Sequence, residues 1–438
     1  MLKINIIGLG YVGLTLGVAL ARKGISVAGL EINELILSTI KKGEAHFFEP
    51  GLNVFLKKVL AEGTFTTAPL LTKAHEPEIY VITVGTPLDE NNNASMVSIT
   101  SVANEIAKNC EEGSLIITRS TTKIGTTRNT LVPIFEQAGK KVHFAVCPER
   151  TVEGKALDEL HEIPQVIGSP DPIAQKLAQN LFINLAPSTP ILNTWEGAET
   201  VKLMDNTYRD IQFAIANEFA QVIEEIGEDA NRVISIANSG YSRTNIAKPG
   251  LVGGPCLEKD PIIFAQSAKA FGVKMPITMA ARTVNQNSIH HGISRIANYF
   301  NNQKEKKIKK ILIFGLAFKG NPSTSDTRGS LAIPFINTMK KKFNEIEVFG
   351  YDEHVMQPDM KGIDCTLVDD LYKAAENTDL VVIQHDAQYI KDIDLNKISN
   401  LMNNSGLIYD FWSLHSRSSL SMENSVSYLS YGSLVGEQ

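Results

Sequence analysis

Residues 3–31 read KINIIGLGYVGLTLGVALARKGISVAGLE, and this stretch decides the fold of the first part of the chain. An isoleucine-rich run predicts a strand over 3–8, a helix follows over 14–23, and a second strand follows over 25–30. The turn between the first strand and the helix has the pattern G-x-G-x-x-G, which is typical of a dinucleotide-binding βαβ unit. The sequence therefore predicts a doubly wound parallel sheet at this end of the chain.

Each glycine of this turn has a physical role in binding a dinucleotide. Gly8 permits the tight turn, Gly10 lets the backbone approach a pyrophosphate, and Gly13 lets the helix pack close to the strand. The N-terminus of the helix then turns its free N–H groups toward the phosphates, and Tyr11 and Val12 of the turn are expected to contact the cofactor as well. The alternative is a decayed domain that keeps these glycines for packing alone.

Glu31 ends the second strand, where an acidic side chain can accept hydrogen bonds from a ribose diol. No arginine follows Glu31, so a 2′-phosphate would meet repulsion at this position. The sequence therefore favours NAD over NADP as the cofactor.

Three further strands are predicted over 79–84, 115–120 and 142–147, and each ends in small or polar residues. Because ligands of parallel sheets lie at the carboxyl ends of the strands, we expect these residues to form one site. For each cluster alone, an ordinary turn or a helix cap at Thr86 is the alternative. The residues concerned are Gly85, Thr86, Ser120, Thr121, Pro148 and Glu149.

A long helix is predicted over 193–227, with Asn193 and Glu196 as a capping box. Apolar residues recur along it every three or four positions and predict a core-facing stripe. A second apolar face around Phe213 and Ala220 suggests a spine between domains or a dimer seam, and hence a homodimer or higher even oligomer. The stripe consists of Val201, Met204, Tyr208, Ile211, Ile215, Phe219, Val222 and Ile226.

Two elements of the middle segment carry reactive groups. Lys202 and Asn206 lie one helical turn apart, which places an ammonium group beside an amide. Cys256 lies in the glycine-rich loop GLVGGPCLEKDP, before a helix that begins with Asp260 as N-cap. The helix N-terminus and nearby Lys259 both favour a thiolate at Cys256. The alternative is that a free cysteine is a small buried apolar residue, which suits Cys110 and Cys365 better.

The last third of the chain repeats the opening pattern, because ILIFGLAFKG at 311–320 matches INIIGLGYVG at 4–13. Gly315 matches Gly8, but Gly10 is replaced by Ala317 and a lysine appears at 319. We therefore expect a second sheet of similar topology that binds no second dinucleotide and uses side chains for an anionic or polyhydroxyl ligand. We also expect the serine-rich tail after Trp412 to be poorly ordered at its end.

Composition limits the class of protein. The 438 residues carry 42 basic and 48 acidic side chains, which argues against nucleic acid as a partner. Four scattered cysteines without a C-x-x-C pair argue against a disulfide framework or a metal site, and they fit a reducing compartment. The apolar stretch over 4–21 is broken by glycines, and nothing else suggests a membrane segment. We expect a cytoplasmic protein that does not bind membranes.

Taken together, these motifs resemble the nucleotide-sugar 6-dehydrogenases that act on UDP-glucose, UDP-N-acetylmannosamine and GDP-mannose. The resemblance covers nearly the whole chain and implies two Rossmann-like parallel-sheet domains joined by a central helical dimerisation domain. The corresponding division is 1–192 for NAD, 193–300 for the helical domain and 301–438 for the nucleotide sugar. The matching motifs are GLGYVGL (8–14), EPGL (49–52), VGTPLDE (84–90), STTKIGTT (120–127), PERTVEG (148–154), KLMDN (202–206), GGPCLEKDP (253–261) and GLAFKG (315–320).

The resemblance implies a four-electron oxidation of the C6 alcohol to a carboxylate, with two NAD consumed per turnover. A Cys256 thiolate would form a thiohemiacetal and then a thioester. Lys202 and Asn206 would stabilise the alkoxide-like oxygens.

The resemblance also assigns the supporting residues. Glu153 and Asp260 would move protons and activate water, Thr121 would hold a water, and Glu149 would support the site. Gly253, Lys319 and Arg328 would contact the substrate, and Arg243 would reach the sugar ligand of the neighbouring subunit. Two departures are Glu31, where many members have Asp, and the loop 250–254, which lacks the usual aromatic–glycine turn.

The segments at 148–154 and 202–210 resemble the UDP-N-acetylhexosamine branch of the family more than the UDP-glucose branch, which implies UDP-N-acetyl-D-mannosamine as the substrate. Arg150 and Arg209 would supply donors for a 2-acetamido carbonyl; the alternative is that both arginines only pair with surface carboxylates at 158, 159 or 210. UDP-glucose and UDP-N-acetylglucosamine 6-dehydrogenases remain alternatives. A two-electron dehydrogenase would need no nucleophilic cysteine, and a non-catalytic NAD-binding dimer would not keep Cys256, Lys202 and Asp260 together.

Overall fold

The computed structural model describes residues 3–303, 307–343, 345–415, 420–422 and 425–433. The chain forms two compact units. The first comprises 1–206 and 262–274, and the second comprises 207–261 and 275–438. The expected division at 192 and 300 remains a prediction.

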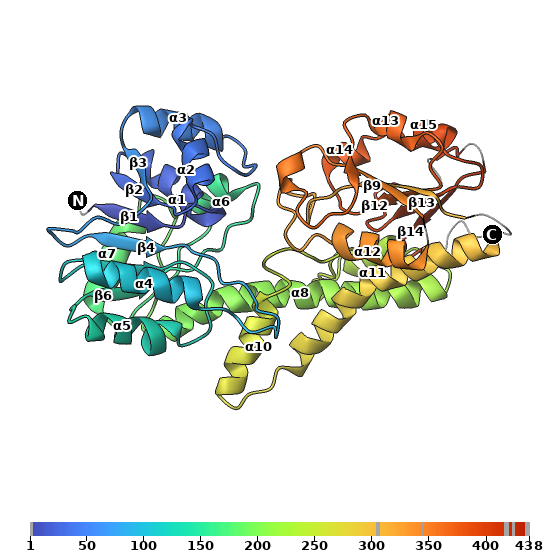
Figure 1. The fold of residues 1–438 in the computed structure, drawn as a ribbon. Coiled ribbons are helices and arrows are strands. Elements are labelled where there is room, and N and C mark those ends of the chain that lie inside the picture. The colour runs from blue at the N-terminus through green and yellow to red at the C-terminus, as the bar shows by residue number, and fades with distance from the viewer. Residues whose placement is uncertain (1–2, 304–306, 344, 416–419, 423–424, 434–438) are drawn as a thin grey trace. The chain divides into compact units, whose positions relative to one another are not determined.

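The first unit contains the predicted parallel sheet, with strand order β3-β2-β1-β4-β5-β6-β7-β8 (Figure 1). Only the β6–β7 pair is antiparallel among the pairings described. Strands β1, β4 and β5 are buried at every position, as expected for strands with helices on both faces. The strands are β1 (Ile4–Ile7), β2 (Val27–Leu30), β3 (Phe65–Ala68), β4 (Ile79–Ile82), β5 (Leu115–Thr118), β6 (His143–Val146), β7 (Ile167–Gly168) and β8 (Ile191–Leu192).

Helices bury both faces of this sheet in separate apolar clusters. The first cluster takes residues from α1 (Tyr11–Ala21), α2 (Glu34–Lys41), α3 (Leu52–Ala61), α6 (Ala156–Glu162) and α7 (Pro172–Phe182). The second takes residues from α4 (Val97–Asn109), from the π-helical turn Thr127–Leu131 and from α5 (Val132–Gln137). Close packing of α1 requires Gly13, because a Cβ atom there would lie 1.9 Å from the carbonyl oxygen of Gly8.

The second unit contains the second predicted sheet, whose strands are all parallel in the order β11-β10-β9-β12-β13-β14. The expectation for the tail was incomplete, because β14 lies after Trp412 and pairs with β13; residues 434–438 lie outside the described part of the chain. The strands are β9 (Lys310–Phe314), β10 (Glu347–Tyr351), β11 (Thr366–Leu367), β12 (Leu380–Ile383), β13 (Leu407–Asp410) and β14 (Ser427–Ser430).

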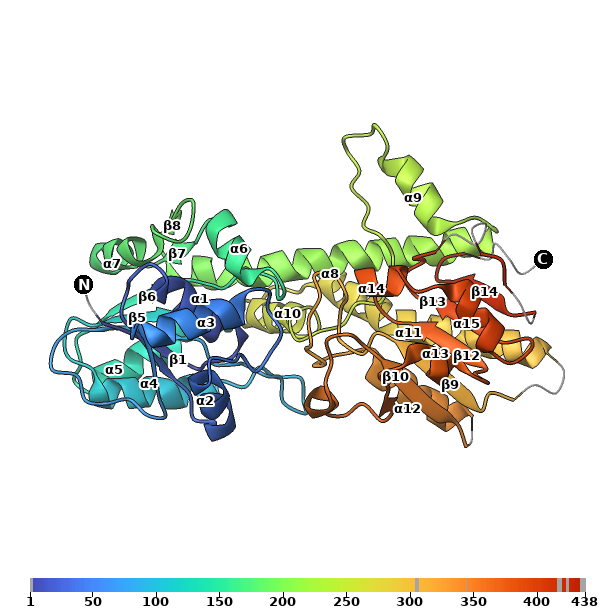
Figure 2. The same ribbon diagram turned by 90° about the horizontal axis from the view of Figure 1, so that it is seen from above.

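Two apolar clusters again cover the two faces of the sheet. One includes residues of α11 (Pro276–Asn302) and α12 (Ala332–Lys342), and the other includes residues of α13 (Leu371–Ala375), α14 (Gln388–Lys391) and α15 (Leu395–Leu401). A 3₁₀ turn spans Gln357–Asp359. Figure 2 shows α9 (Ala230–Asn238) and the chain after it projecting away from this sheet.

The long helix is α8 (Trp195–Glu225), close to its predicted bounds, but its cap was predicted wrongly. The hydroxyl of Thr194, not the side chain of Asn193, accepts the N–H of Gly197. Glu196 instead binds Arg128, 2.6 Å away. The remaining helix, α10 (Asp260–Ala270), begins at the residue predicted to precede it.

The predicted core stripe of α8 was assigned to the wrong side. Tyr208 is 63% exposed, Ile226 is 70% exposed, and Ile215, Phe219 and Val222 between them are exposed as well. The opposite face, which includes Ala214, Ala216 and Ala220, is buried. The helix therefore buries these alanines, together with Leu203 and Ile223, and presents the large apolar residues of the predicted stripe outward.

The second sheet repeats the opening turn of the first but uses it differently. Gly315 has a φ of +93°, close to the +95° of Gly8, so the tight turn is preserved. Asp352 follows β10 as Glu31 follows β2. Its Oδ2 accepts the N–H groups of Leu316 (2.8 Å) and Ala317 (3.0 Å) and contacts Nε2 of buried His385 at 3.2 Å. Asp352 thus accepts two N–H groups of its turn, whereas Glu31 accepts one, and the contact with His385 is an addition of the second unit.

Electrostatics keep Asp352 ionised. Burial alone would raise the pKa of Asp352, but the hydrogen bonds from His385 and the backbone outweigh it and hold that pKa well below its usual range.

Among the helices of the described residues, none is long and apolar enough to cross a membrane.

We expect Asp352→Asn to lower the free energy of unfolding of the second unit by about 2 kcal/mol near neutral pH, because the amide loses the charge that the donors described above and the N–H groups of His354 and Val355 bind. The only tryptophans are Trp195 in the first unit and Trp412 in the second. Urea unfolding followed by Trp412 fluorescence, in a Trp195→Phe background, therefore reports on the second unit.

The pH dependence has a definite sign. The pKa of folded Asp352 lies below the unfolded value of ~3.9, so its stabilisation is present above that value and is lost as pH falls. The difference in the free energy of unfolding between the parent and the variant should become smaller below pH ~4. Two results would contradict the role of the ionised Asp352. One is equal stability of the parent and the variant near neutral pH, and the other is a difference in stability that does not change at acid pH.

Candidate active site

The first unit brings the polar ends of neighbouring strands together, as expected. The hydroxyl of Thr86, after β4, donates to the carbonyl of Thr121, after β5, at 2.7 Å. The Ser120 hydroxyl donates back to the carbonyl of Val84 at 2.7 Å. Thr86 is not a helix cap, because the next helix begins only at Val97.

Two positions at this edge are glycines although neither the packing of the protein nor the backbone conformation requires glycine there. A Cβ atom at Gly10 or at Gly85 would meet nothing within 4 Å, and neither residue has a left-handed φ. Among the glycines of the described residues, no others combine these two properties. The side-chain space of both is therefore available to a ligand, which fits the approach of a pyrophosphate to the ends of β1 and β4.

Glu31 lies against the glycine turn. Its Oε2 accepts the N–H of Leu9 at 3.0 Å, and its Oε1 accepts the N–H of Asn33 at 2.9 Å. A carboxylate held at this place is suited to a ribose diol. The residues present therefore fit a dinucleotide at the turn.

A buried ion pair that the sequence analysis missed joins the ends of β5 and β6. Nη2 of Arg119 lies 2.5 Å from Oε2 of Glu149, and Arg119 is only 1% exposed. Its Nη1 also donates to Gln165 at 2.6 Å and to the carbonyl of Cys147 at 3.3 Å. The only signal in the sequence was a charged residue directly before the Ser120–Thr121 cluster.

Glu149 is ionised because two cations oppose the effect of burial. Burial alone would raise the pKa of Glu149, but Arg119 and Lys202 outweigh it and hold that pKa below its usual value. Glu149 also accepts the N–H of Thr151. Lys202 of α8 thus belongs to the same charged cluster as the strand ends, and Asn206 lies one turn further along α8.

The two candidate sugar-binding arginines differ in their surroundings. Nε of Arg150 binds Asp205 at 2.7 Å, so its partner is a carboxylate on α8 rather than one of the three surface carboxylates considered from the sequence. Arg209 is exposed. Asp210 does not hold it, because the buried Asp210 carboxylate binds Arg282 and Asn285.

In the second unit, three motif loops pack on one another. A Cβ atom at Gly253 would lie 2.4 Å from the carbonyl oxygen of Gly329, and one at Gly254 would lie 2.3 Å from the ring of Phe318. The N–H of Gly254 donates to the Gly329 carbonyl at 2.9 Å. The loop of Cys256 therefore lies against both the 315–320 turn and the 326–329 loop.

Cys256 is the exposed thiol among the four free cysteines. Burial raises the pKa of Cys147 to about 12, that of Cys365 to about 11, and that of Cys110 above its usual value. Cys256 lies one turn before α10, because its carbonyl accepts the N–H of Asp260 at 2.9 Å. The Asp260 carboxylate is fully buried and binds Lys259 at 2.7 Å.

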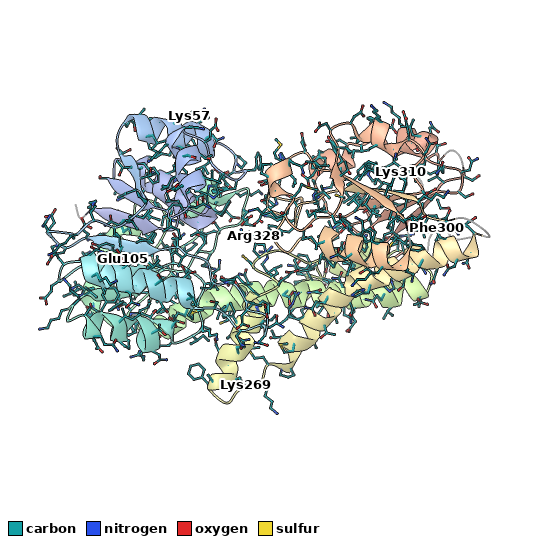
Figure 3. All side chains as sticks on the ribbon, in the orientation of Figure 1. Lys57, Glu105, Lys269, Phe300, Lys310 and Arg328 are labelled. Atoms are coloured by element: carbon teal, nitrogen blue, oxygen red, sulfur yellow. The ribbon has the colours of Figure 1, made fainter. Side chains whose placement is uncertain are left out.

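The remaining candidate residues of the second unit are cationic. Nζ of Lys319 lies 5.6 Å from the centre of the Phe318 ring. Arg328, labelled in Figure 3, lies on the loop before α12 and makes a bidentate pair with Asp326 while its side chain stays 69% exposed. Arg243 lies exposed in the chain after α9, with its guanidinium 4.6 Å from the ring of Tyr241.

Glu258 is an acidic residue beside Cys256 that the sequence analysis did not select. Burial raises its pKa to about 7; Arg282 opposes this increase and Asp210 adds to it. Its carboxylate lies beside Gly329. Only its position, two residues after the cysteine, distinguished it in the sequence.

The candidate residues thus divide between the two units. The first holds the glycine turn, Glu149, Glu153, Lys202 and Asn206, and the second holds Cys256, Asp260 and the cationic loops. Each set is assembled from separate stretches of the sequence within its own unit.

Known proteins match this chain over most of its length. Three domains of the UDP-glucose/GDP-mannose dehydrogenase family match it: the NAD binding domain over 2–186, the central domain over 196–287 and the UDP binding domain over 312–417. A UDP-N-acetyl-D-mannosamine dehydrogenase of Methanococcus maripaludis is 33% identical over 93% of this chain and 92% of its own.

Two further relatives show the same pattern. An NDP-N-acetyl-D-galactosaminuronic acid dehydrogenase of Ralstonia nicotianae is 29% identical over 91% of this chain and 93% of its own. The structure of a UDP-D-ManNAc dehydrogenase from Pyrococcus horikoshii matches with a TM-score of 0.87 and 27% identity, over 98% of this chain and 99% of that one. From the three matched domains and these relatives, we conclude that the chain belongs to the UDP-glucose/GDP-mannose dehydrogenase family of NAD-dependent oxidoreductases.

Proposed function

We propose that the protein oxidises the C6 hydroxyl of a UDP-sugar to a carboxylate in two steps, through a covalent intermediate on Cys256. The observation that carries this proposal is the packing of the Cys256 loop onto the 315–320 and 326–329 loops. A sugar nucleotide held by Lys319 and Arg328 would lie beside the one exposed thiol of the four cysteines.

The chemistry requires a nucleophile because an aldehyde is a poor hydride donor. Loss of a proton and a hydride from the alcohol gives the aldehyde, and the Cys256 thiolate then bonds to its carbon to form a thiohemiacetal. Loss of a second hydride, together with the hydroxyl proton, leaves a thioester, which water cleaves to release the acid and the thiol. Bound NAD supplies the hydride acceptor, so two NAD are consumed for each acid.

The chain's own polar groups serve the charges that develop. The Lys202 ammonium and the Asn206 amide would stabilise the oxygen at C6. Glu153 and Asp260 would exchange protons with the substrate and with water, and Thr121 would hold that water. Glu149 would keep Lys202 in place, since their opposite charges already interact.

NAD would bind at the carboxyl ends of the first sheet. Gly8, Gly10 and Gly13, with the N–H groups of Tyr11 and Val12, would surround the pyrophosphate, and Glu31 would bind the ribose. Gly85, Thr86, Ser120 and Thr121 would border the remainder of the cofactor.

We further propose UDP-N-acetyl-D-mannosamine as the preferred substrate, for a surface polysaccharide precursor. The relatives described above are named for N-acetylated sugars, UDP-N-acetyl-D-mannosamine among them. Arg150 and Arg209 are the proposed donors to the acetamido carbonyl, while Gly253 and Arg243 would frame the sugar, Arg243 from a neighbouring subunit. UDP-glucose and UDP-N-acetylglucosamine are the competing substrates.

A homodimer would explain the exposed stripe of α8. Large apolar side chains between Tyr208 and Ile226 are costly to leave in water, and a two-fold seam is the commonest way to cover such a face. We place the protein in the cytoplasm, because its four cysteines are all free.

A substrate panel tests the reaction. We expect two NADH per acid formed, with UDP-N-acetylmannosamine preferred by kcat/KM over UDP-glucose and GDP-mannose. One NADH per substrate would reject the four-electron reaction, and preference for UDP-glucose would reject only the choice of sugar.

Within the same assay, Cys256→Ser should form no acid but should still bind NAD, because a serine hydroxyl is far less ionised than a thiol. Cys365→Ser is the matched control and should keep full activity. Acid production by the Cys256 variant would refute the covalent route.

Gly10→Val and Gly85→Val test the cofactor site. We expect both variants to fold normally, because a Cβ atom at either position meets no protein atom within 4 Å, and to lose NAD affinity by about tenfold or more. Titration calorimetry measures the affinity, and Ser38→Val on exposed α2 controls for an added branched side chain. Unchanged affinity in both variants would show that NAD binds elsewhere.

Light scattering tests the seam on α8. The 48.0 kDa chain should have at least twice that mass at micromolar concentration, and the Phe219→Glu/Val222→Glu variant should have the single-chain mass. Glu218→Ala, which changes an exposed polar residue on the same helix, should leave the mass unchanged. A parent protein of 48.0 kDa would overturn the proposal.

A further inference from the structure

The EPGL motif at 49–52 has no role in the chemistry above, yet the structure places its acid in the interior. Gly51 adopts a left-handed φ of +75° at the start of α3, and Leu52 is fully buried. This turn directs the Glu49 side chain inward, where it is only 7% exposed. A buried carboxylate needs hydrogen-bond donors, so its partners indicate its function.

The backbone partners of Glu49 closely follow the proposed catalytic Glu153 in the chain, and Tyr11 adds a contact to the residue before it. Oε2 of Glu49 accepts the N–H of Gly154 at 2.7 Å, and Oε1 accepts the N–H of Leu157 at 3.3 Å. The Tyr11 hydroxyl donates to the same carboxylate. That hydroxyl also lies 3.2 Å from the carbonyl oxygen of Val152 and accepts the N–H of Gly154 at 2.9 Å.

Tyr11 is suited to act as a fixed donor. Burial and the Glu49 carboxylate raise the pKa of Tyr11 far above its usual value, so the phenol keeps its proton. Its ring packs on Phe47, with centroids 4.9 Å apart. Its backbone is the first residue of α1, directly after Gly10 of the glycine turn.

We propose that Glu49 and Tyr11 are positioning residues that hold Glu153 in place through the backbone of Val152 and Gly154. The inference rests on the proposed function of Glu153. It also gives Tyr11 two roles, because its backbone belongs to the cofactor turn and its side chain to the loop of the catalytic acid. The 148–154 loop is then fixed at both ends, since Arg119 holds Glu149.

Glu49→Gln and Tyr11→Phe test the proposal in the full-length enzyme. Each should lower kcat by about 10- to 100-fold, because small displacements of a catalytic group have effects of this size. The KM values for NAD and for the UDP-sugar should change less than about twofold, since no contact to either is removed. Asn53→Ala is the matched control, because Asn53 accepts the N–H of Ala45 in the same segment without reaching the 148–154 loop; it should keep the parent kcat.

A double-variant cycle separates positioning from general stability. Adding Glu49→Gln to Glu153→Gln should cause no further loss of kcat, because the positioned group is already gone. Additive losses, or a higher KM for NAD with unchanged kcat, would overturn the proposal.

Amide hydrogen exchange gives a readout that needs no activity. In Glu49→Gln, the peptide over 152–158 should exchange faster than in the parent, while the β9–β12 core of the second unit should be unchanged. Unchanged exchange at 152–158 would refute the positioning contact itself. If the parent formed no acid from any UDP-sugar, the proposed function would fail, and the exchange result would still decide whether Glu49 holds the loop.

Discussion

The buried ion pair between Arg119 and Glu149 is the interaction on which the geometry of the first unit's site depends. A charge in the interior is tolerated only with its partner, and removing one member of such a pair typically costs about 3–5 kcal/mol. The end of β5 and the loop after β6 therefore cannot shift independently. Because Glu149 also interacts with Lys202, the same pair sets the electrostatic surroundings of the first residues of α8.

Short sequence patterns correctly predicted turns and strands of both sheets. The turn at 8–13, the strands that end at the polar clusters and the repeat at 311–320 follow from glycine spacing and short apolar runs, which tertiary packing does not change. The charged contacts of the site could not be predicted from the sequence in this way. Arg119 and Glu49 find their partners 30 and 105 residues away, and one chain alone carries no signal of such distant contacts.

The long helix shows where periodicity stops being informative. A repeat of three and four residues identified a stripe on α8, but it does not say which side meets the core. Here the small residues at 214, 216 and 220 are buried, because the chain packs closest where side chains are short. Glu196 had the spacing of a capping box, but it binds Arg128 from a distant segment, and Thr194 caps the helix.

The turn at 315–320 of the second sheet differs from the glycine turn of the first by more than one residue. The second turn has Ala317 where the first turn has Gly10, and protein groups lie close around it. The Asp352 carboxylate binds the turn's own N–H groups, and a Cβ atom at Gly315 would lie 2.6 Å from the ring of His385. Replacing Ala317 with glycine would therefore not by itself recreate the first turn, because the His385 ring would still lie against Gly315 and would still contact Asp352. The two turns thus differ at more than one residue, and a single substitution would not convert the second into the first.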